Sequence, residues 1–169
     1  MAELKLWLDS YDDIYSDFDS RHYPKRRISE DFLDEIRAEI KYKDDVSGEL
    51  ILLMPEKKRN EESEKTISES LAVYFNSRFN FLNHKCHRLM RKALILLMAG
   101  LLLMLLNSWM SYYHMISFAV AAVKILVEPA GWFLLWLAFD ILFYDHPLLK
   151  KERSFFKKLG SMHVLFACS

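Results

Sequence analysis

The stretch "ALILLMAGLLLMLLNSWM", residues 93–110, contains eighteen residues without a charged side chain. A helix needs about 20 predominantly apolar residues to cross a hydrocarbon core about 30 Å thick, so this stretch is near the lower limit for a membrane span. Arg91 and Lys92 come directly before it and mark one end. The first expectation for the fold is therefore a membrane-crossing helix over residues 93–110.

A second apolar region follows at residues 115–144. The interruptions in it are Lys124, Glu128, Pro129 and Asp140. As a straight helix the region would extend about 45 Å, which is too long for one untilted span. Pro129 offers a place to divide it into an interfacial or tilted part and a crossing part. The second span is therefore predicted at about residues 125–144.

Basic residues flank the two predicted spans and are absent from the connector "SYYH", residues 111–114. They are Lys85, Arg88, Arg91 and Lys92 before the first span, and Lys150, Lys151, Arg153, Lys157 and Lys158 after the second. By the positive-inside rule the spans form a hairpin in the plasma or inner membrane, with both termini in the cytoplasm. Aromatic residues are expected to anchor it at the interfaces: Trp109, Tyr112, Tyr113, Trp132 and Tyr144.

The charge is divided between the two halves of the chain. Residues 1–83 carry nineteen acidic and thirteen basic side chains, whereas residues 84–169 carry four and ten. Because the basic residues flank apolar runs, the lipid bilayer is the expected partner, rather than nucleic acid. The clusters "PKRR" (24–27) and "KKR" (57–59) lack an RNA-binding aromatic signature, and anionic lipid headgroups are nearer candidates for them. A solvated surface is favoured over both.

Residues 1–83 read as a small cytoplasmic α/β domain. "LKLWL" (4–8) fits a short strand or a piece of amphipathic helix, and a helix is predicted from Ser29, as its cap, to near Tyr42. "ELILLMP" (49–55) is a continuous apolar run typical of a buried strand. Asn60 is placed to cap a further helix, which either continues into the first span or breaks near Asn83.

After the hairpin, residues 84–147, the segment 148–169 is predicted to form a helix and then a strand. "MHVLFA" (162–167) follows Gly160 and is expected to pair with "ELILLM", so that both ends of the chain close one domain. The predicted fold class is a membrane α-helical hairpin of two transmembrane helices plus a small cytoplasmic α/β domain.

Polar side chains within the predicted spans are the candidate functional residues. Asp140 lies about four residues inside the second span, at the depth of Arg91 and Lys92, which favours an ion pair across the hairpin, or simple snorkelling to the membrane surface, over a proton or ion path. Lys124 and Glu128 are four residues apart and can pair on one helical face. Asn107 lies at a comparable depth and is able to form a hydrogen bond across the hairpin. An interfacial position near water is an equally good interpretation for Lys124, Glu128 and Asn107.

The sequence offers little support for metal binding or catalysis. Histidine and cysteine in "HKCH" (84–87) are too tightly spaced on a helix to converge on one ion, and no second cluster completes a site. The aspartates between residues 9 and 19 lack the pattern of a calcium-binding loop. No phosphate-binding loop or nucleophile–base arrangement is present in the sequence. We therefore expect no cofactor, no metal and no enzymatic activity.

Three stretches together resemble a group of uncharacterised bacterial membrane proteins: "SDFDSRHYPKRRISEDFLDEI" (16–36), "LILLMPEKKRNEESEKTI" (50–67) and "GWFLLWLAFDILFYDHPL" (131–148). These proteins pair an N-terminal cytoplasmic α/β segment with two C-terminal spans. The motif residues that match in the last stretch are Gly131, Trp132, Asp140, Tyr144, Asp145, Pro147 and Leu148, with Phe143 in place of leucine. The resemblance implies the topology and carries no activity.

Two functions from different classes are compatible with these observations. The first is a non-enzymatic membrane scaffold or interaction protein that self-associates or joins a membrane complex. Small residues that permit close helix contacts support it: Ala99, Gly100, Ala121, Ala122, Ala130 and Gly131. The second is a homo-oligomeric channel or pore-forming effector, since two spans alone cannot enclose a conduit.

Overall fold

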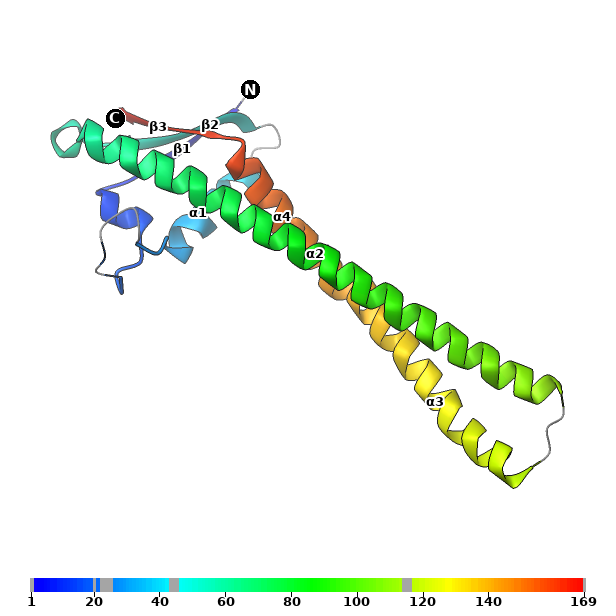
Figure 1. Ribbon diagram of the computed structural model, residues 1–169. Coiled ribbons are helices and arrows are strands. Elements are labelled where there is room, and N and C mark those ends of the chain that lie inside the picture. Colours follow the sequence, from blue (N-terminus) through cyan, green and yellow to red (C-terminus); the bar gives the residue numbers. More distant parts are fainter. Residues whose placement is uncertain (1, 20, 22–25, 43–45, 114–116, 169) are drawn as a thin grey trace. The chain divides into compact units, whose positions relative to one another are not determined.

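The computed structural model describes residues 2–19, 21, 26–42, 46–113 and 117–168 (Figure 1). Its elements, in chain order, are β1 (Ala2–Trp7), the 3₁₀ turn η1 (Tyr11–Ile14), α1 (Glu30–Tyr42), β2 (Val46–Met54), η3 (Glu56–Lys58), α2 (Glu61–Tyr112), α3 (Phe118–Asp140), the π-helical segment η4 (Ile141–Asp145), α4 (His146–Gly160) and β3 (His163–Cys168). They divide into a sheet unit, residues 1–80 with 154–169, and a hairpin unit, residues 81–153.

The three strands of the sheet unit form one parallel sheet in the order β1-β2-β3. The predicted pairing of the C-terminal strand with "ELILLM" is confirmed, because Leu50 lies opposite Val164 and Leu52 opposite Phe166. The stretch "LKLWL" is a strand and not a helix, and it adds a third strand beside β2. The third strand supplies the hydrogen bonds and the apolar face that a two-stranded sheet would lack.

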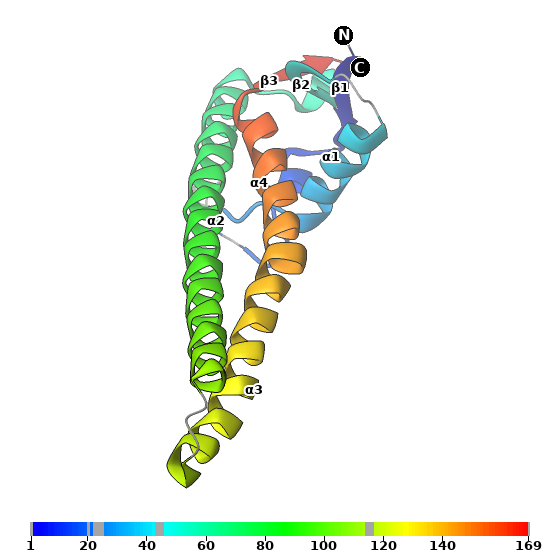
Figure 2. The same cartoon turned by 90° about the vertical axis from the view of Figure 1, so that its right-hand side faces the viewer.

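The helices of the sheet unit cover one face of the sheet, as the two views show (Figures 1 and 2). Alternate strand residues point toward them and are buried: Leu4, Leu6, Leu50, Leu52 and Met54. The helices contribute Phe32, Leu33, Ile36, Ile67, Leu71, Phe75 and Phe156 to the same core. The apolar stripes of α1 and α2 therefore form the core against this face.

Helix α2 shows whether the helix that begins after Asn60 continues into the first predicted span or breaks near Asn83. It runs without a break from Glu61 to Tyr112, so the helix of the sheet unit continues past Asn83 into the first predicted span. Asn60 caps it as predicted, since its Oδ1 accepts the backbone N–H groups of Glu62 and Ser63 at 3.0 and 3.2 Å. The predicted turn after Tyr42 and the N-terminal half of "PKRR" fall on residues 43–45 and 24–25, outside the described residues.

The hairpin unit consists of the second part of α2, then α3, η4 and the first part of α4. Both α2 and the helical run from Phe118 to Gly160 are long and apolar enough to cross a membrane. In their most apolar windows only 11% and 6% of the residues are buried within the structure, unlike the core helices of a water-soluble protein. Helix α3 passes through Pro129 without interruption.

Candidate functional site

Two glycines bring the helices of the hairpin together. A Cβ atom added to Gly100 would lie 2.9 Å from Cγ of Leu135, and one added to Gly131 would lie 3.0 Å from Sδ of Met104. A further alanine is buried seven residues from each glycine, Ala93 on α2 and Ala138 on α3. The seven-residue spacing is typical of two helices packed along a narrow seam.

Only some of the small residues that were predicted to permit close helix contacts lie in the seam. Gly100 and Gly131 form it, whereas Ala121, Ala122 and Ala130 are exposed on other faces of α3. Sequence reasoning missed Ala93 and Ala138, although their spacing of seven residues from the two glycines is visible in the sequence. A heptad count would have found them.

Contacts between α2 and α3 fix the antiparallel register of the hairpin. Gly131 lies against Gly100 and Met104, and Lys124 on α3 reaches Ser111 on α2. Counting nine residues along α3 from Gly131 places Asp140 opposite residues 91–95 of α2, which include Arg91 and Lys92. The expected common depth of these three side chains follows from this register.

Asp140 nevertheless faces away from α2. Ala138 is buried in the seam, and two residues further along an α-helix is a rotation of about 200°, so Asp140 is exposed on the opposite side. Within the described residues no ion pair or hydrogen bond joins Asp140 to Arg91 or Lys92. The predicted clasp across the hairpin is therefore not formed, because common depth does not imply a common face.

The outer end of the hairpin holds a different polar contact from the one expected. Lys124 Nζ donates to Ser111 Oγ at 2.7 Å, and Ser111 Oγ donates to the backbone oxygen of Asn107 at 2.9 Å. In the described part of the chain, Lys124 forms no ion pair with Glu128, which is exposed. The side-chain Oδ1 of Asn107 is buried without a hydrogen-bond partner, so its expected bond across the hairpin is not made through that atom.

The predicted aromatic anchors occupy two different kinds of position. Trp109, Tyr112 and Tyr113 are exposed and adjacent at the end of α2, with the rings of Trp109 and Tyr113 5.4 Å apart. Tyr144 lies at the other end, in η4. Trp132 directly follows Gly131 and lies midway along α3 between Lys124 and Asp140.

The rings of α3 and η4 form an open cavity around Asp140. The cavity has a volume of about 260 Å³ and is lined by Trp136, Phe139, Asp140, Phe143 and Tyr144. Every one of these side chains is exposed, so the cavity opens on the outward face of the hairpin. Segment η4 begins directly after the carboxylate, and π-helical turns occur frequently at functional sites.

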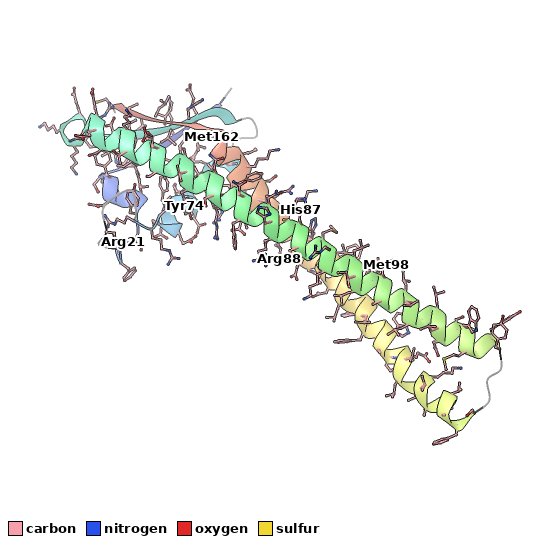
Figure 3. The ribbon with its side chains drawn as sticks, viewed as in Figure 1. Arg21, Tyr74, His87, Arg88, Met98 and Met162 are labelled. Atoms are coloured by element: carbon pink, nitrogen blue, oxygen red, sulfur yellow. The ribbon has the colours of Figure 1, made fainter. Side chains whose placement is uncertain are left out.

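At the inner end of the hairpin, α2 meets η4 and α4. Arg153 donates to Oδ1 of Asn83 at 3.2 Å, and a cavity of about 150 Å³ is lined by Cys86, His87, Met90, His146 and Arg153. Figure 3 marks His87 and Arg88 on this part of α2 and Met98 further along it. Among the residues that the structure describes, no three histidine, cysteine or acidic side chains gather as a metal site would require.

The sheet unit contains a buried ionic contact that the sequence analysis did not find. Glu64, only 8% exposed, accepts two hydrogen bonds of 2.8 Å from Arg59 and one of 3.1 Å from Tyr11. Arg59 also donates to the backbone oxygen of Phe166 at 3.2 Å. The contact therefore ties η1, the start of α2 and β3 together.

Its electrostatics are those of a structural ion pair. The Arg59 guanidinium holds the pKa of the Glu64 carboxyl below its usual value, although burial acts in the opposite direction. Burial raises the pKa of Tyr11 beside it. The signal in the sequence was the position of Glu64 on the apolar stripe of α2, three residues before Ile67 and seven before Leu71.

Figure 2 shows the helices of the sheet unit on one side of the sheet, and in the described part of the chain apolar side chains are exposed on the second face. Trp7 is 53% exposed and Leu165 is 46% exposed. Ile51 and Leu53 of the central strand are half-buried between them, in register with Leu165 and Trp7 respectively. We call these four residues the outer sheet patch. A contiguous exposed apolar surface of this kind is typical of a protein-binding site.

No protein-family model, curated protein or solved structure matches this chain. The resemblance to bacterial membrane proteins therefore rests on the quoted motifs. In the structure these motif residues serve different roles, because Gly131 lies in the seam, Asp140 lines the outward cavity, and Tyr144 and Asp145 belong to η4.

Proposed function

We propose that this chain is a membrane-anchored, non-enzymatic interaction protein. The hairpin unit is the anchor, and the sheet unit presents the outer sheet patch to another copy of the chain or to a protein of a membrane complex. Both termini and the sheet unit lie on the cytoplasmic side of the plasma or inner membrane. The observation that carries the proposal is the outward apolar surface of the hairpin, whose helices pack through small residues.

The arrangement of side chains in the hairpin supports the anchor. The residues that lie between the two helices are small and bury little surface: Gly100, Gly131, Ala93 and Ala138. The large side chains point outward: Leu94, Ile95, Met98, Leu101, Leu102, Leu105, Leu106, Trp132, Phe133 and Trp136. In water such a surface would be costly, whereas lipid chains would cover it on every side.

The distribution of charge supports the orientation. Lys85, Arg88 and Arg91 lie before the apolar segment of α2, and further basic residues follow η4 in α4. Lys124 is the one basic residue near the connector, and its ammonium group is engaged by Ser111. The excess of positive charge at the open end of the hairpin favours the cytoplasm for that end.

The anchor is tested by extraction and by cysteine labelling. The whole chain is expected to stay in the membrane pellet at alkaline pH. In a background with Cys86→Ser and Cys168→Ser, a membrane-impermeant maleimide should label S117C from outside intact cells and S154C only after lysis. Both serines are exposed, so the substitutions remove no buried contact. Labelling of S154C from outside the cell would contradict the orientation.

The interaction is tested at the outer sheet patch. Trp7→Ser with Leu165→Ser should lower the assembly size of the protein in nanodiscs, or abolish its cross-linking to neighbouring membrane proteins, while the circular dichroism spectrum is retained. Leu102→Ser on the lipid-facing side of α2 is the matched control, because its side chain is similarly exposed. Unchanged assembly and cross-linking in the patch variant would rule out this surface as the contact.

A pore formed by several copies is the second candidate function, and one observation favours it. Asp140 points outward from the hairpin, which is the direction a carboxylate needs if several hairpins are to place it on a common axis. Size measurement in nanodiscs separates the two functions. A strict monomer would exclude the pore, since two helices alone cannot enclose a conduit.

A further inference from the structure

Asp140 stands alone as a charge in an apolar surface. Between Trp132 and Tyr144 it is the only charged residue in the sequence. Its side chain lines the cavity of about 260 Å³ on the outward face, together with four aromatic residues. The basic side chains at the same depth, Arg91 and Lys92, belong to α2, and in the described part of the hairpin neither forms an ion pair or hydrogen bond with it.

The backbone gives this cavity its shape. Phe139 and Phe143 lie on successive turns with ring centroids 6.0 Å apart and planes inclined by 42°. The wider turn of η4 starts immediately after Asp140 and carries Phe143 and Tyr144 on the same outward side. Trp136, which is 72% exposed, closes the other side one turn before the carboxylate.

The chemistry of these groups favours the binding of a cation in the cavity. A carboxylate at the margin of an apolar medium is stabilised by an opposite charge. The faces of tryptophan, phenylalanine and tyrosine rings also attract cations, most strongly organic ammonium groups that can shed part of their hydration. A carboxylate with four aromatic neighbours in one open cavity therefore combines both interactions that hold an ammonium ion.

We propose that this cavity binds the ammonium group of a zwitterionic lipid headgroup, such as that of phosphatidylethanolamine or phosphatidylcholine. The inference rests on the proposed membrane insertion of the hairpin. Asp140 lies level with Arg91 and Lys92, which mark the inner end of the apolar segment of α2, so the cavity opens where headgroups border the hydrocarbon core. The lipid's chains would then lie along the exposed aromatic and aliphatic side chains of α3.

The test is the binding of defined lipids to the whole protein in detergent, measured by native mass spectrometry. Dioleoyl phosphatidylethanolamine, phosphatidylcholine and phosphatidylglycerol are added in equal amounts. The unmodified protein should retain the two ammonium lipids about tenfold more tightly than phosphatidylglycerol, whose headgroup has no ammonium. Asp140→Asn should remove most of this preference, and Trp136→Leu should reduce it while leaving the carboxylate in place.

Glu128→Gln is the matched control, because Glu128 is an exposed carboxylate of the same helix outside the cavity. It should leave the preference unchanged. Asp140 and Trp136 are exposed, and circular dichroism melting of each variant verifies that the helices are intact. Equal retention of all three lipids by the unmodified protein, or the same loss in Glu128→Gln as in Asp140→Asn, would overturn the proposal.

Two further outcomes separate this inference from its premise. If the chain is released by alkaline extraction yet shows the headgroup preference in detergent, the proposed anchor is wrong and the cavity chemistry stands. If the chain resists extraction but Asp140→Asn alters only its assembly size, the carboxylate contacts a second copy and the lipid site is excluded.

Discussion

The two units of this protein place the same kinds of side chain in opposite positions. The sheet unit buries large apolar residues, such as Phe75 and Leu52, and exposes most of its charges, with Glu64 a buried exception. The hairpin unit buries glycine and alanine and exposes leucine, tryptophan and phenylalanine. In the first unit burial away from water stabilises the fold, whereas in the second close backbone approach does so and the large side chains suit a lipid environment. Equivalent substitutions should therefore act differently in the two units.

The largest difference is expected for leucine truncation. Leu71→Ala leaves a cavity in the fully buried core of the sheet unit and should cost about 3 kcal/mol. Leu102→Ala on the outward face of α2 should cost less than about 0.5 kcal/mol. Hydrogen exchange of β2 amides in nanodisc-held protein measures the first effect as exchange more than about a hundredfold faster. Equal costs at the two positions would contradict the comparison.

Breaking the ionic contact of the sheet unit should lower its stability by an amount comparable to that of Leu71→Ala, and this loss should depend on pH. Glu64→Gln removes the charge that Arg59 needs and should cost about 2–3 kcal/mol at neutral pH. Because the folded pKa of Glu64 is depressed, its contribution is present above the unfolded pKa and is lost as pH falls through the folded value.

Urea unfolding of the sheet unit, followed by circular dichroism, checks both parts of this prediction. The difference between the unmodified protein and Glu64→Gln should be full at pH 7 and shrink steadily below about pH 4.5, the usual value for a glutamic acid. Asp34→Asn is a control, since its ion pair with Arg37 is exposed. A difference that grows on acidification would show that the Glu64 carboxylate is not stabilised by the fold.

Filling the seam should separate the hairpin helices. Gly131→Leu places atoms where Met104 lies and should cost about 1–3 kcal/mol. Ala130→Leu adds a similar volume one residue away on an exposed face and should be tolerated. The comparison is made by unfolding in mixed detergent micelles. If both variants unfold alike, the helices do not pack through Gly131.

The smallest effect is expected at the outer end of the hairpin. Ser111→Ala removes the acceptor of the Lys124 ammonium and should cost about 0.6 kcal/mol, the average for interhelical hydrogen bonds in membrane proteins. Glu128→Gln should be neutral, because Glu128 forms no ion pair with Lys124 in the described residues. The same micelle assay resolves the two, and a larger loss in Glu128→Gln would mean that Lys124 pairs along its own helix.

The sequence was sufficient for features that depend on local pattern. The length of the apolar runs predicted the two long helices, and alternation and flanking glycine predicted the strands. The residue type and position of Asn60 predicted the cap of α2. The side of each helix that faces its neighbour was harder to predict. Residue counting shows that Asp140 and Arg91 share a depth. The side of α3 that faces α2 is set by Ala138 and Gly131, and these small residues do not stand out within an apolar run. The Arg59 side chain that pairs with Glu64 also donates to Phe166 of β3, a strand from the far end of the sequence, and residue spacing does not reveal such a contact.

Segment η4 has a genetic consequence. A π-helical turn closes over one more residue than an α-helical turn, so it is the form that an α-helix takes after a single codon is inserted. Deleting one codon between Ile141 and Asp145 would restore α-helical winding and rotate Asp140 by about 100° relative to the residues that follow. Lineages that lack this codon would present a different side of α3 to their surroundings, so one in-frame indel could redirect the outward face without changing any other residue.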